Sequence, residues 1–263
     1  MADYALTLSD AEVARYRIMA DSAERAERHL WTDAGAVPGA RVADVGCGPG
    51  AVSVRLAALT APGGEVWAVD RDPQALAIAR ALADKEGAAV TTVNAPATAT
   101  GLPAGTFDLV MLRHVLAHNG GHEQEIVDHL AGLVRPGGSV YLTDVDAAYL
   151  RFRAPIDPAV NELHDRYREF HRRRGNDLEI GAKLDRLLTA AGLELAYFQG
   201  RIDVVNPPPG MRGPAWAARD AMVEDGLASA EDIARWDAAY NAMTGPATFF
   251  APSFTAYARR PES

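Results

Sequence analysis

The nine residues Val42-Ala43-Asp44-Val45-Gly46-Cys47-Gly48-Pro49-Gly50 decide the fold of this chain. The apolar run predicts a strand, and the three glycines predict a turn that lets backbone approach a ligand, because glycine has no Cβ. An Ala-, Val- and Leu-rich segment then indicates a helix whose unpaired N–H groups and positive dipole end face the turn. A second apolar run ends in one acid, Asp70. Strand, glycine turn, helix, strand and acid together indicate half of a nucleotide-type binding site.

Apolar runs and helical segments alternate strictly as far as residue 145. Such alternation requires a parallel sheet with right-handed crossovers. The spacing of Ser9-Asp10-Ala11-Glu12 is typical of a capping box and predicts a first helix that reaches about residue 34. The pattern predicts seven strands, at 41–46, 65–70, 90–93, 107–112, 139–144, 193–205 and 247–258.

The alternation of strand and helix patterns ends after residue 146. Residues 147–192 are largely helical and polar, Pro207-Pro208-Pro209-Gly210 breaks the chain, and 214–244 predicts two amphipathic helices. Because nothing resembles a domain linker, we expect one domain over residues 1–263. Its predicted parts are an N-terminal helix (1–36), a ligand-binding core (40–145) and two helical lid insertions (147–192 and 206–246).

The net charge of −9 disfavours a nucleic-acid partner, since phosphate binding relies on a basic surface. The start of the chain lacks the layout of a signal peptide, and no run of about 18 apolar residues predicts a membrane span. The single cysteine, Cys47, excludes an internal disulfide and a multi-thiolate metal cage. We therefore expect a soluble cytoplasmic protein that acts on a small molecule, with a homodimer kept open as its assembly.

Two acids accompany the glycine turn. Asp44 lies inside the first strand, where a carboxylate is costly unless it is paired, so it is expected to brace the loop or to face a positive group. Asp70 ends the next strand, where a ribose diol requires a bidentate acceptor. The absence of Gly-Lys-Ser/Thr excludes a triphosphate-binding loop.

These motifs resemble those of the class I S-adenosylmethionine-dependent methyltransferases, in particular the small-molecule type 11 group. The resemblance covers about residues 40–145 and implies a Rossmann-like α/β fold. In that fold seven strands form a mostly parallel sheet with the last strand antiparallel, helices on both faces and lid insertions. The matching pieces are the nine-residue stretch above, Ala68-Val69-Asp70, Gly101-Leu102-Pro103, Phe107-Asp108-Leu109-Val110, Arg113-His114-Val115-Leu116-Ala117-His118 and Leu133-Val134-Arg135-Pro136-Gly137-Gly138.

The resemblance also implies where S-adenosylmethionine binds. The loop formed by Gly46, Cys47 and Gly48, with Asp44 behind it, would cradle the methionine moiety, and Asp70 would bind the ribose. Residues after the fourth strand, beginning at Arg113, would line the methionine end, and Tyr16 of the first helix would close over the cofactor. Relatives carry an acid in the loop after the third strand, which residues 94–100 lack. Adenine would then be held by backbone at Pro96 and Ala97 and by packing against Arg71.

Histidines follow the fourth strand at 114, 118 and 122. Asn119-Gly120-Gly121 interrupts any helix there, so a shared metal-binding face is not expected, and we predict no metal site. His118 is the candidate catalytic residue, either as a general base or as a neutral hydrogen-bonding group, with His114 as the alternative. Cys47 is expected to be a packing residue. Asp144 and Asp146 are expected either to contact substrate or to be solvated, and Arg172-Arg173-Arg174 to form a solvated helix face.

The sequence thus predicts methyl transfer from S-adenosylmethionine to a small molecule. Two alternatives remain at this point. Gly46-x-Gly48-x-x-Ala51 also fits the dinucleotide fingerprint of nicotinamide-dependent oxidoreductases. The missing adenine-side acid also allows a catalytically inactive methyltransferase-like protein. A further variant would use the same cofactor for chemistry other than methyl transfer.

Overall fold

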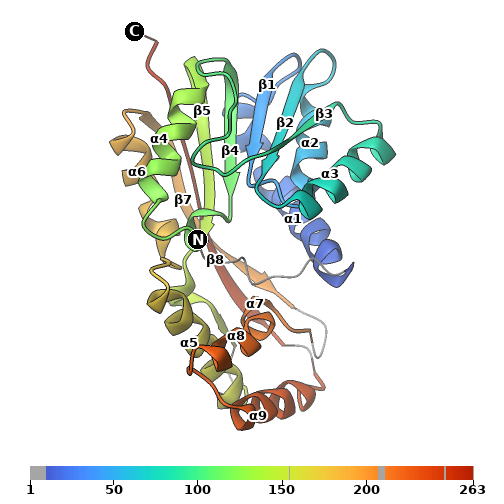
Figure 1. Cartoon of the computed structure of the whole chain (residues 1–263), viewed down its shortest axis with the longest axis vertical. Helices are drawn as coiled ribbons and strands as arrows, with labels where there is room; N and C mark the ends of the chain where they lie inside the picture. Colours follow the sequence, from blue (N-terminus) through green and yellow to red (C-terminus); the bar gives the residue numbers. More distant parts are fainter. Residues whose placement is uncertain (1–9, 154, 207–210, 246, 263) are drawn as a thin grey trace.

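The computed structural model describes residues 10–153, 155–206, 211–245 and 247–262 (Figure 1). Its centre is an eight-stranded sheet of order β3-β2-β1-β4-β5-β8-β6, in which β7 also pairs with β8. The strands β5 and β6 pair with successive parts of one edge of β8, and β7 pairs with the opposite edge. The first five strands are parallel, β8 is antiparallel to β5, and β7 is antiparallel to β8. The strands are β1 (Arg41–Val45), β2 (Glu65–Asp70), β3 (Val90–Asn94), β4 (Phe107–Arg113), β5 (Val134–Val145), β6 (Arg151–Phe152), β7 (Glu194–Val205) and β8 (Phe249–Arg259).

All seven predicted strands are present, and the expected antiparallel last strand is confirmed. The additional strand, β6, has only two residues, which is too short for alternation to reveal. Ser9 and Pro207-Pro208-Pro209-Gly210, on which the predicted capping box and chain break depend, lie outside the described residues. The helical segments are α1 (Asp10–Asp33), α2 (Ala51–Thr60), α3 (Pro73–Glu86), η1 (Leu116–His118), α4 (Glu123–Leu133), η2 (Ala147–Tyr149), α5 (Pro158–Arg173), η3 (Ile180–Lys183), α6 (Leu184–Ala190), α7 (Pro214–Ala217), α8 (Arg219–Glu224) and α9 (Ala230–Asn241).

Each face of the sheet has its own apolar layer, because successive strand residues point to opposite faces. On one face Ala43, Val45 and Val110 pack with α4 and α6, and on the other Val42 and Leu109 pack with α1 and α2. The segment of α6 was assigned from sequence to the lid, but the structure places it on the sheet beside α4, with Leu184 and Leu188 in the sheet core.

The segments α5, α7, α8 and α9 form a separate group, here called the cap, below the carboxyl ends of β4 and β5 in Figure 1. The cap has its own core, in which Met222 and Trp236 are fully buried and Tyr240 is 2% exposed. The region 214–244 contains three short helices rather than the two predicted, because turns at Ala218 and at 225–229 interrupt it. Within the described residues, no helix combines the length and the apolar character needed to cross a membrane.

One carboxylate of α1 joins this helix to three strands. Glu27 is fully buried and forms ion pairs with Arg113 at the end of β4 and with Arg201 of β7, at 3.0 Å from Arg201. The Tyr141 hydroxyl of β5 donates to the same carboxylate at 2.8 Å. Arg113 also donates to Thr143 Oγ1 at 3.1 Å, and Thr143 hydrogen-bonds to Thr255 of β8. Burial opposes ionisation of Glu27, but Arg113, Arg201 and Tyr141 outweigh it and lower the pKa to about 2.

Replacing Glu27 with Ala is expected to destabilise the protein by about 3–5 kcal/mol, because it leaves the buried Arg113 without its counter-charge. Urea unfolding measures this loss. Glu24→Ala, one turn earlier on α1, is the matched control: Glu24 is 30% exposed in its ion pairs with Arg28 and Arg55, so its loss should cost less than about 1 kcal/mol. Equal losses of unfolding free energy in the two variants would show that the buried Glu27–Arg113 pair stabilises the protein no more than an exposed pair does.

The same carboxylate makes stability depend on pH. Because folding lowers the pKa of Glu27 from 4.5 to about 2, its contribution is fully present above pH 4.5 and is lost as the pH falls toward 2. The difference in unfolding free energy between the wild type and Glu27→Gln should therefore be largest near pH 7 and shrink by on the order of 2–3 kcal/mol at pH 2–3. Urea unfolding across this range tests it, and a difference that stays constant with pH would contradict the assignment.

Candidate functional site

The glycine loop lies at the carboxyl end of β1 and is fixed to β2. The backbone N–H groups of Gly46 and Cys47 both donate to the carbonyl oxygen of Val69, at 2.7 and 3.0 Å. A Cβ on Gly46 would lie 2.3 Å from Val115, and one on Gly50 would lie 2.7 Å from Ala79, so both positions exclude any larger residue. Both also have a positive φ, which favours glycine. These two glycines therefore serve packing.

Gly48 faces in another direction. It also has a positive φ, of 53°, but among the described residues a Cβ there would have only the Tyr16 ring within 4 Å, at 3.7 Å. The ring of Tyr16 on α1 thus lies over the loop backbone at Gly48, within van der Waals distance of such a Cβ. That Tyr16 closes over the cofactor stays a prediction.

Asp70 ties the loop to the end of β2. One carboxylate oxygen accepts from the N–H of Gly48 at 2.8 Å, and the other accepts from the N–H of Asp72 at 2.9 Å. Asp72 in turn caps α3 through the N–H of Gln74. Each oxygen of Asp70 keeps a second lone pair, so the carboxylate can still accept from a ribose diol.

Asp44 is the buried acid behind the loop. It is 3% exposed, and Ser53 of α2 donates its hydroxyl proton to it at 2.6 Å. Burial raises its pKa to about 6, against the lowering effects of Ser53 and Arg113. Such a carboxylate is stabilised by any cationic group that approaches the loop. Sequence reasoning found Asp44 but missed Ser53, which looks like an ordinary small helix residue.

The remaining predicted site residues near the loop are Cys47, Arg71, Pro96 and Ala97. Burial, with the charges of Asp44 and Asp70, raises the pKa of the Cys47 thiol, so it is a poor nucleophile and fits the predicted packing role. After β3, Ala95 donates its N–H to the carbonyl of Asp70 at 3.1 Å, which places Pro96 and Ala97 beside the end of β2. Pro96 and Arg71 are exposed, and Ala97 is half-buried against the core.

The end of β4 begins with Arg113, whose guanidinium is engaged by Glu27 and Thr143 as described above. His114 follows with φ of 56°, rare for a residue with a side chain, and its N–H donates to the carbonyl of Thr143 at 2.8 Å. Burial and the charge of Arg113 lower the pKa of His114 to about 3. The chain then turns into η1, which ends at His118.

His118 is the point at which the loop after β4 meets the cap. Its ring lies 4.9 Å, centroid to centroid, from the ring of His171 on α5, and Tyr167 packs on His171 at 4.4 Å. Asn176 hydrogen-bonds to His171 and accepts from the N–H of Gly120, so it links α5 to the loop after β4 beside this ring contact. Burial, with a smaller effect of Arg71, lowers the pKa of His118 to about 4, so its ring is neutral at pH 7. Neither His171 nor Tyr167 belongs to a motif that marks it as a site residue in the sequence.

The acids at the end of β5 act on backbone. Asp144 is 1% exposed and accepts from the N–H groups of Ala117 and Val145, so it holds η1 in place. Asp146 is 4% exposed and caps η2 through the N–H of Ala148 at 3.0 Å. The alternative that these acids are solvated is therefore wrong.

Two further predictions concern surface charges. Arg172, Arg173 and Arg174 pair with Glu169 and Asp225 on the outside of the cap, which confirms the predicted helix face. The exposed ring of His122 pairs with Glu125 rather than joining His114 and His118. In the part of the chain that the structure describes, no three His, Cys, Asp or Glu side chains come together as metal ligands.

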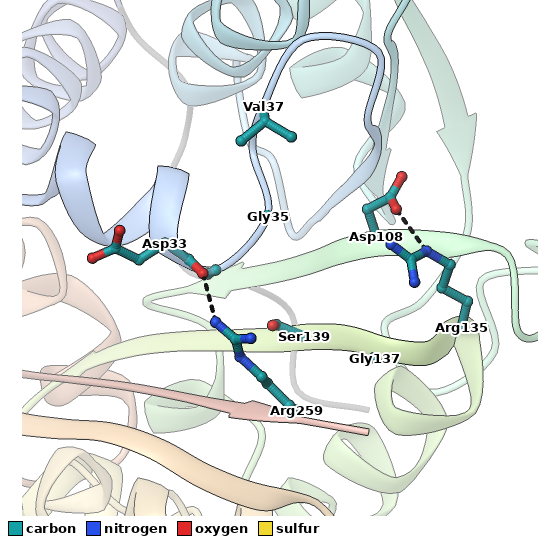
Figure 2. A pocket seen from close by; sticks show the side chains of 9 residues that line it. Asp33, Gly35, Val37, Asp108, Arg135, Gly137, Ser139 and Arg259 are labelled. Carbon is teal, nitrogen blue, oxygen red and sulfur yellow. Dashed lines mark hydrogen bonds and ion pairs between the residues drawn. The ribbon is translucent and has the colours of Figure 1, made fainter. Parts of the chain in front are cut away.

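A small pocket of about 120 Å³ lies at the opposite edge of the sheet (Figure 2). Asp108 at the start of β4 pairs there with Arg135 at 2.7 Å, and Arg259 donates to the carbonyl of Asp33 at 3.1 Å. Ligands of open α/β sheets bind at the carboxyl ends of the strands, whereas this pocket lies at the amino ends of β4 and β5. It is therefore separate from the candidate site.

Comparison with known proteins agrees with this geometry. Residues 42–138 match the family described as a methyltransferase domain. The chain is 34% identical over 143 residues to a ribosomal protein L11 methyltransferase of Methylococcus capsulatus, covering 49% of this chain and 44% of the relative. It is 35% identical over 122 residues to a ubiquinone biosynthesis O-methyltransferase of Burkholderia pseudomallei, covering 45% and 50%. The chain thus spans about half the length of the curated relatives it matches.

Solved structures share the fold. A SAM-dependent methyltransferase from Aquifex aeolicus superimposes with a TM-score of 0.55 at 14% identity, covering 96% of this chain and 98% of that one. The 4+2 cyclase SpnF superimposes with a TM-score of 0.57 at 20% identity, covering 92% and 82%. The segment that matches the methyltransferase domain family, residues 42–138, spans the glycine loop, Asp70 and the loop after β4, and the chain has the fold of S-adenosylmethionine-dependent methyltransferases.

Proposed function

We propose that this protein transfers the methyl group of S-adenosylmethionine to a small-molecule acceptor in the cytoplasm. The observation that carries the proposal is the meeting of the Gly48 loop, Asp70 and His118 at one edge of the sheet, inside the segment that matches methyltransferase domains. This match also removes the support for a nicotinamide-dependent oxidoreductase, because the glycine spacing was its only basis.

The residues at the loop fit this cofactor. S-adenosylmethionine supplies a methyl group made electrophilic by its sulfonium. The backbone at Gly48 would contact the methionine moiety, and the buried Asp44 would favour its cationic groups. Asp70 would accept from the ribose. The chain's main contribution is then to align the acceptor with the methyl group, which can supply roughly 7–11 kcal/mol of the barrier.

The cap favours a small acceptor over a protein. Tyr167 and His171 of α5 pack against His118, so this chain itself covers the acceptor side of the loop after β4. A polypeptide acceptor would need an open rim at that place. One relative is named for ribosomal protein L11 and the other for ubiquinone biosynthesis, so the relatives do not share one acceptor, and the acceptor is inferred from this chain's own cap.

The cofactor assignment is tested by calorimetry with S-adenosylhomocysteine. The wild type should bind it, and Asp70→Asn should weaken binding at least tenfold, because a charged acceptor of the ribose hydroxyls is lost, at about 1.5–3 kcal/mol. Asp84→Asn, an exposed acid on α3, is the control and should bind like the wild type. Unchanged affinity of Asp70→Asn, or stabilisation by NADPH alone, would contradict the proposal.

His118 is proposed as the group that accepts a proton from an oxygen or carbon acceptor. Its neutral ring has an unprotonated nitrogen at pH 7. His118→Ala should then lower kcat by about 10²–10⁴-fold, measured as release of S-adenosylhomocysteine with the identified acceptor. Binding of S-adenosylhomocysteine should change little. His122→Ala, four residues on and 63% exposed, should keep its kcat. A kcat of His118→Ala equal to that of the wild type would exclude a role as base.

A further inference from the structure

A second, larger pocket lies where the cap joins the sheet. Its volume is about 630 Å³, and it opens between η2, β6 and α5, directly after the end of β5. It is thus near the edge that carries the candidate site, unlike the small pocket in Figure 2. Nothing in the site described above uses this pocket.

One side of the pocket is a polar row on α5. Asn161, His164, Asp165 and Arg168 line it, at helix positions i, i+3, i+4 and i+7. Residues at this spacing share one helix face. The opposite face of α5, with Leu163 and Phe170, is buried in the cap core. The helix therefore presents an apolar face to the cap and a polar face to the pocket.

The other side of the pocket carries two arginines. Arg151 pairs with Phe250 in the ladder between β6 and β8, and the N–H of Arg153 donates to the carbonyl of Thr248 at 2.8 Å. The backbone of both arginines is thus fixed by β8. Phe152 between them is 9% exposed and packs in the cap core, and it lines the pocket together with both arginines.

The pocket has an excess of positive charge. Asp165 forms an ion pair with Arg168, which also donates to the carbonyl of Ala147 at 3.2 Å. Among the described residues, neither Arg151 nor Arg153 has a carboxylate partner for its guanidinium. Each guanidinium presents donors in a geometry that matches a carboxylate or phosphate, and here two of them line one pocket in a chain of net charge −9. Phe152, Phe250 and Leu150 add apolar lining beside them.

A row of side chains leads from this pocket to His118. His164, Arg168 and His171 follow one another along α5 at spacings of four and three, and the ring of His171 contacts that of His118. Seven residues of helix span roughly 10 Å. A ligand held at Arg151 and Arg153 would have to extend at least that far along the row for its other end to reach the loop after β4.

We propose that this pocket binds the anionic end of an elongated small-molecule acceptor, with a carboxylate or phosphate at Arg151 and Arg153 and the methyl-accepting group directed toward His118. The proposal rests on the proposed methyl transfer and adds the class of acceptor. The two arginines determine specificity by charge, and they do not take part in the transfer itself.

The test compares two probes of equal shape by calorimetry in the presence of S-adenosylhomocysteine. They are 4-(4-hydroxyphenyl)butanoate and its uncharged amide. The wild type should bind the acid at least tenfold more tightly than the amide. R151Q/R153Q should remove this preference, and R172Q, which changes an exposed arginine of α5 paired with Glu169, should keep it. The proposal is overturned if the wild type binds both probes alike, or if R172Q loses the preference as fully as R151Q/R153Q.

Binding of S-adenosylhomocysteine, measured alone on the same three proteins, separates this proposal from the proposed function. If all three proteins bind S-adenosylhomocysteine but the wild type does not prefer the acid over the amide, only the acceptor class is wrong. If none binds it while the acid preference is present in the absence of cofactor and absent in R151Q/R153Q, the pocket proposal for an anion holds and the methyl-transfer function fails.

Discussion

The buried carboxylate of Glu27 is the interaction on which the arrangement of the site depends. Removing a carboxylate from water is costly, and Arg113, Arg201 and Tyr141 together offset that cost. Because these partners come from β4, β7 and β5, the ion-pair cluster fixes α1 across the half of the sheet that bears the loop after β4. It places Tyr16 on the glycine loop and holds the point from which the chain turns toward His118.

Carboxylates at the carboxyl ends of strands hold the loops in place in the same way. Asp70 accepts from the N–H of Gly48, Asp144 from that of Ala117, and Asp146 from that of Ala148. A backbone N–H at such an edge has no ladder partner, so a carboxylate placed there satisfies it and fixes the loop. An acid after a buried strand is therefore a positioning group first. Of the three, Asp70 is the one that holds the glycine loop, and it is the proposed acceptor for the ribose.

The sequence was sufficient for the features that depend on local pattern. Alternating apolar runs located seven strands, and the glycines with Asp70 located the cofactor edge, because both signals lie within short segments. It could not reveal Glu27, whose partner Arg113 lies 86 residues away, since a glutamate on a charged helix looks solvated until the fold buries it. The contact of His118 with His171 likewise depends on how the cap packs. The position of α6 depends on which apolar surface of the sheet is left uncovered by the other helices.

The match to the methyltransferase family model covers only part of the molecule. The match to methyltransferase domains ends at residue 138, whereas the larger pocket is lined from Ala148 onward. Cofactor binding requires backbone geometry that few sequences provide, as the contacts of Gly46 and Gly50 show. Acceptor binding requires only that a cap of suitable shape and charge lie beside His118. The polar face of α5 and the two arginines of the β6 segment can therefore change the acceptor without disturbing the cofactor edge.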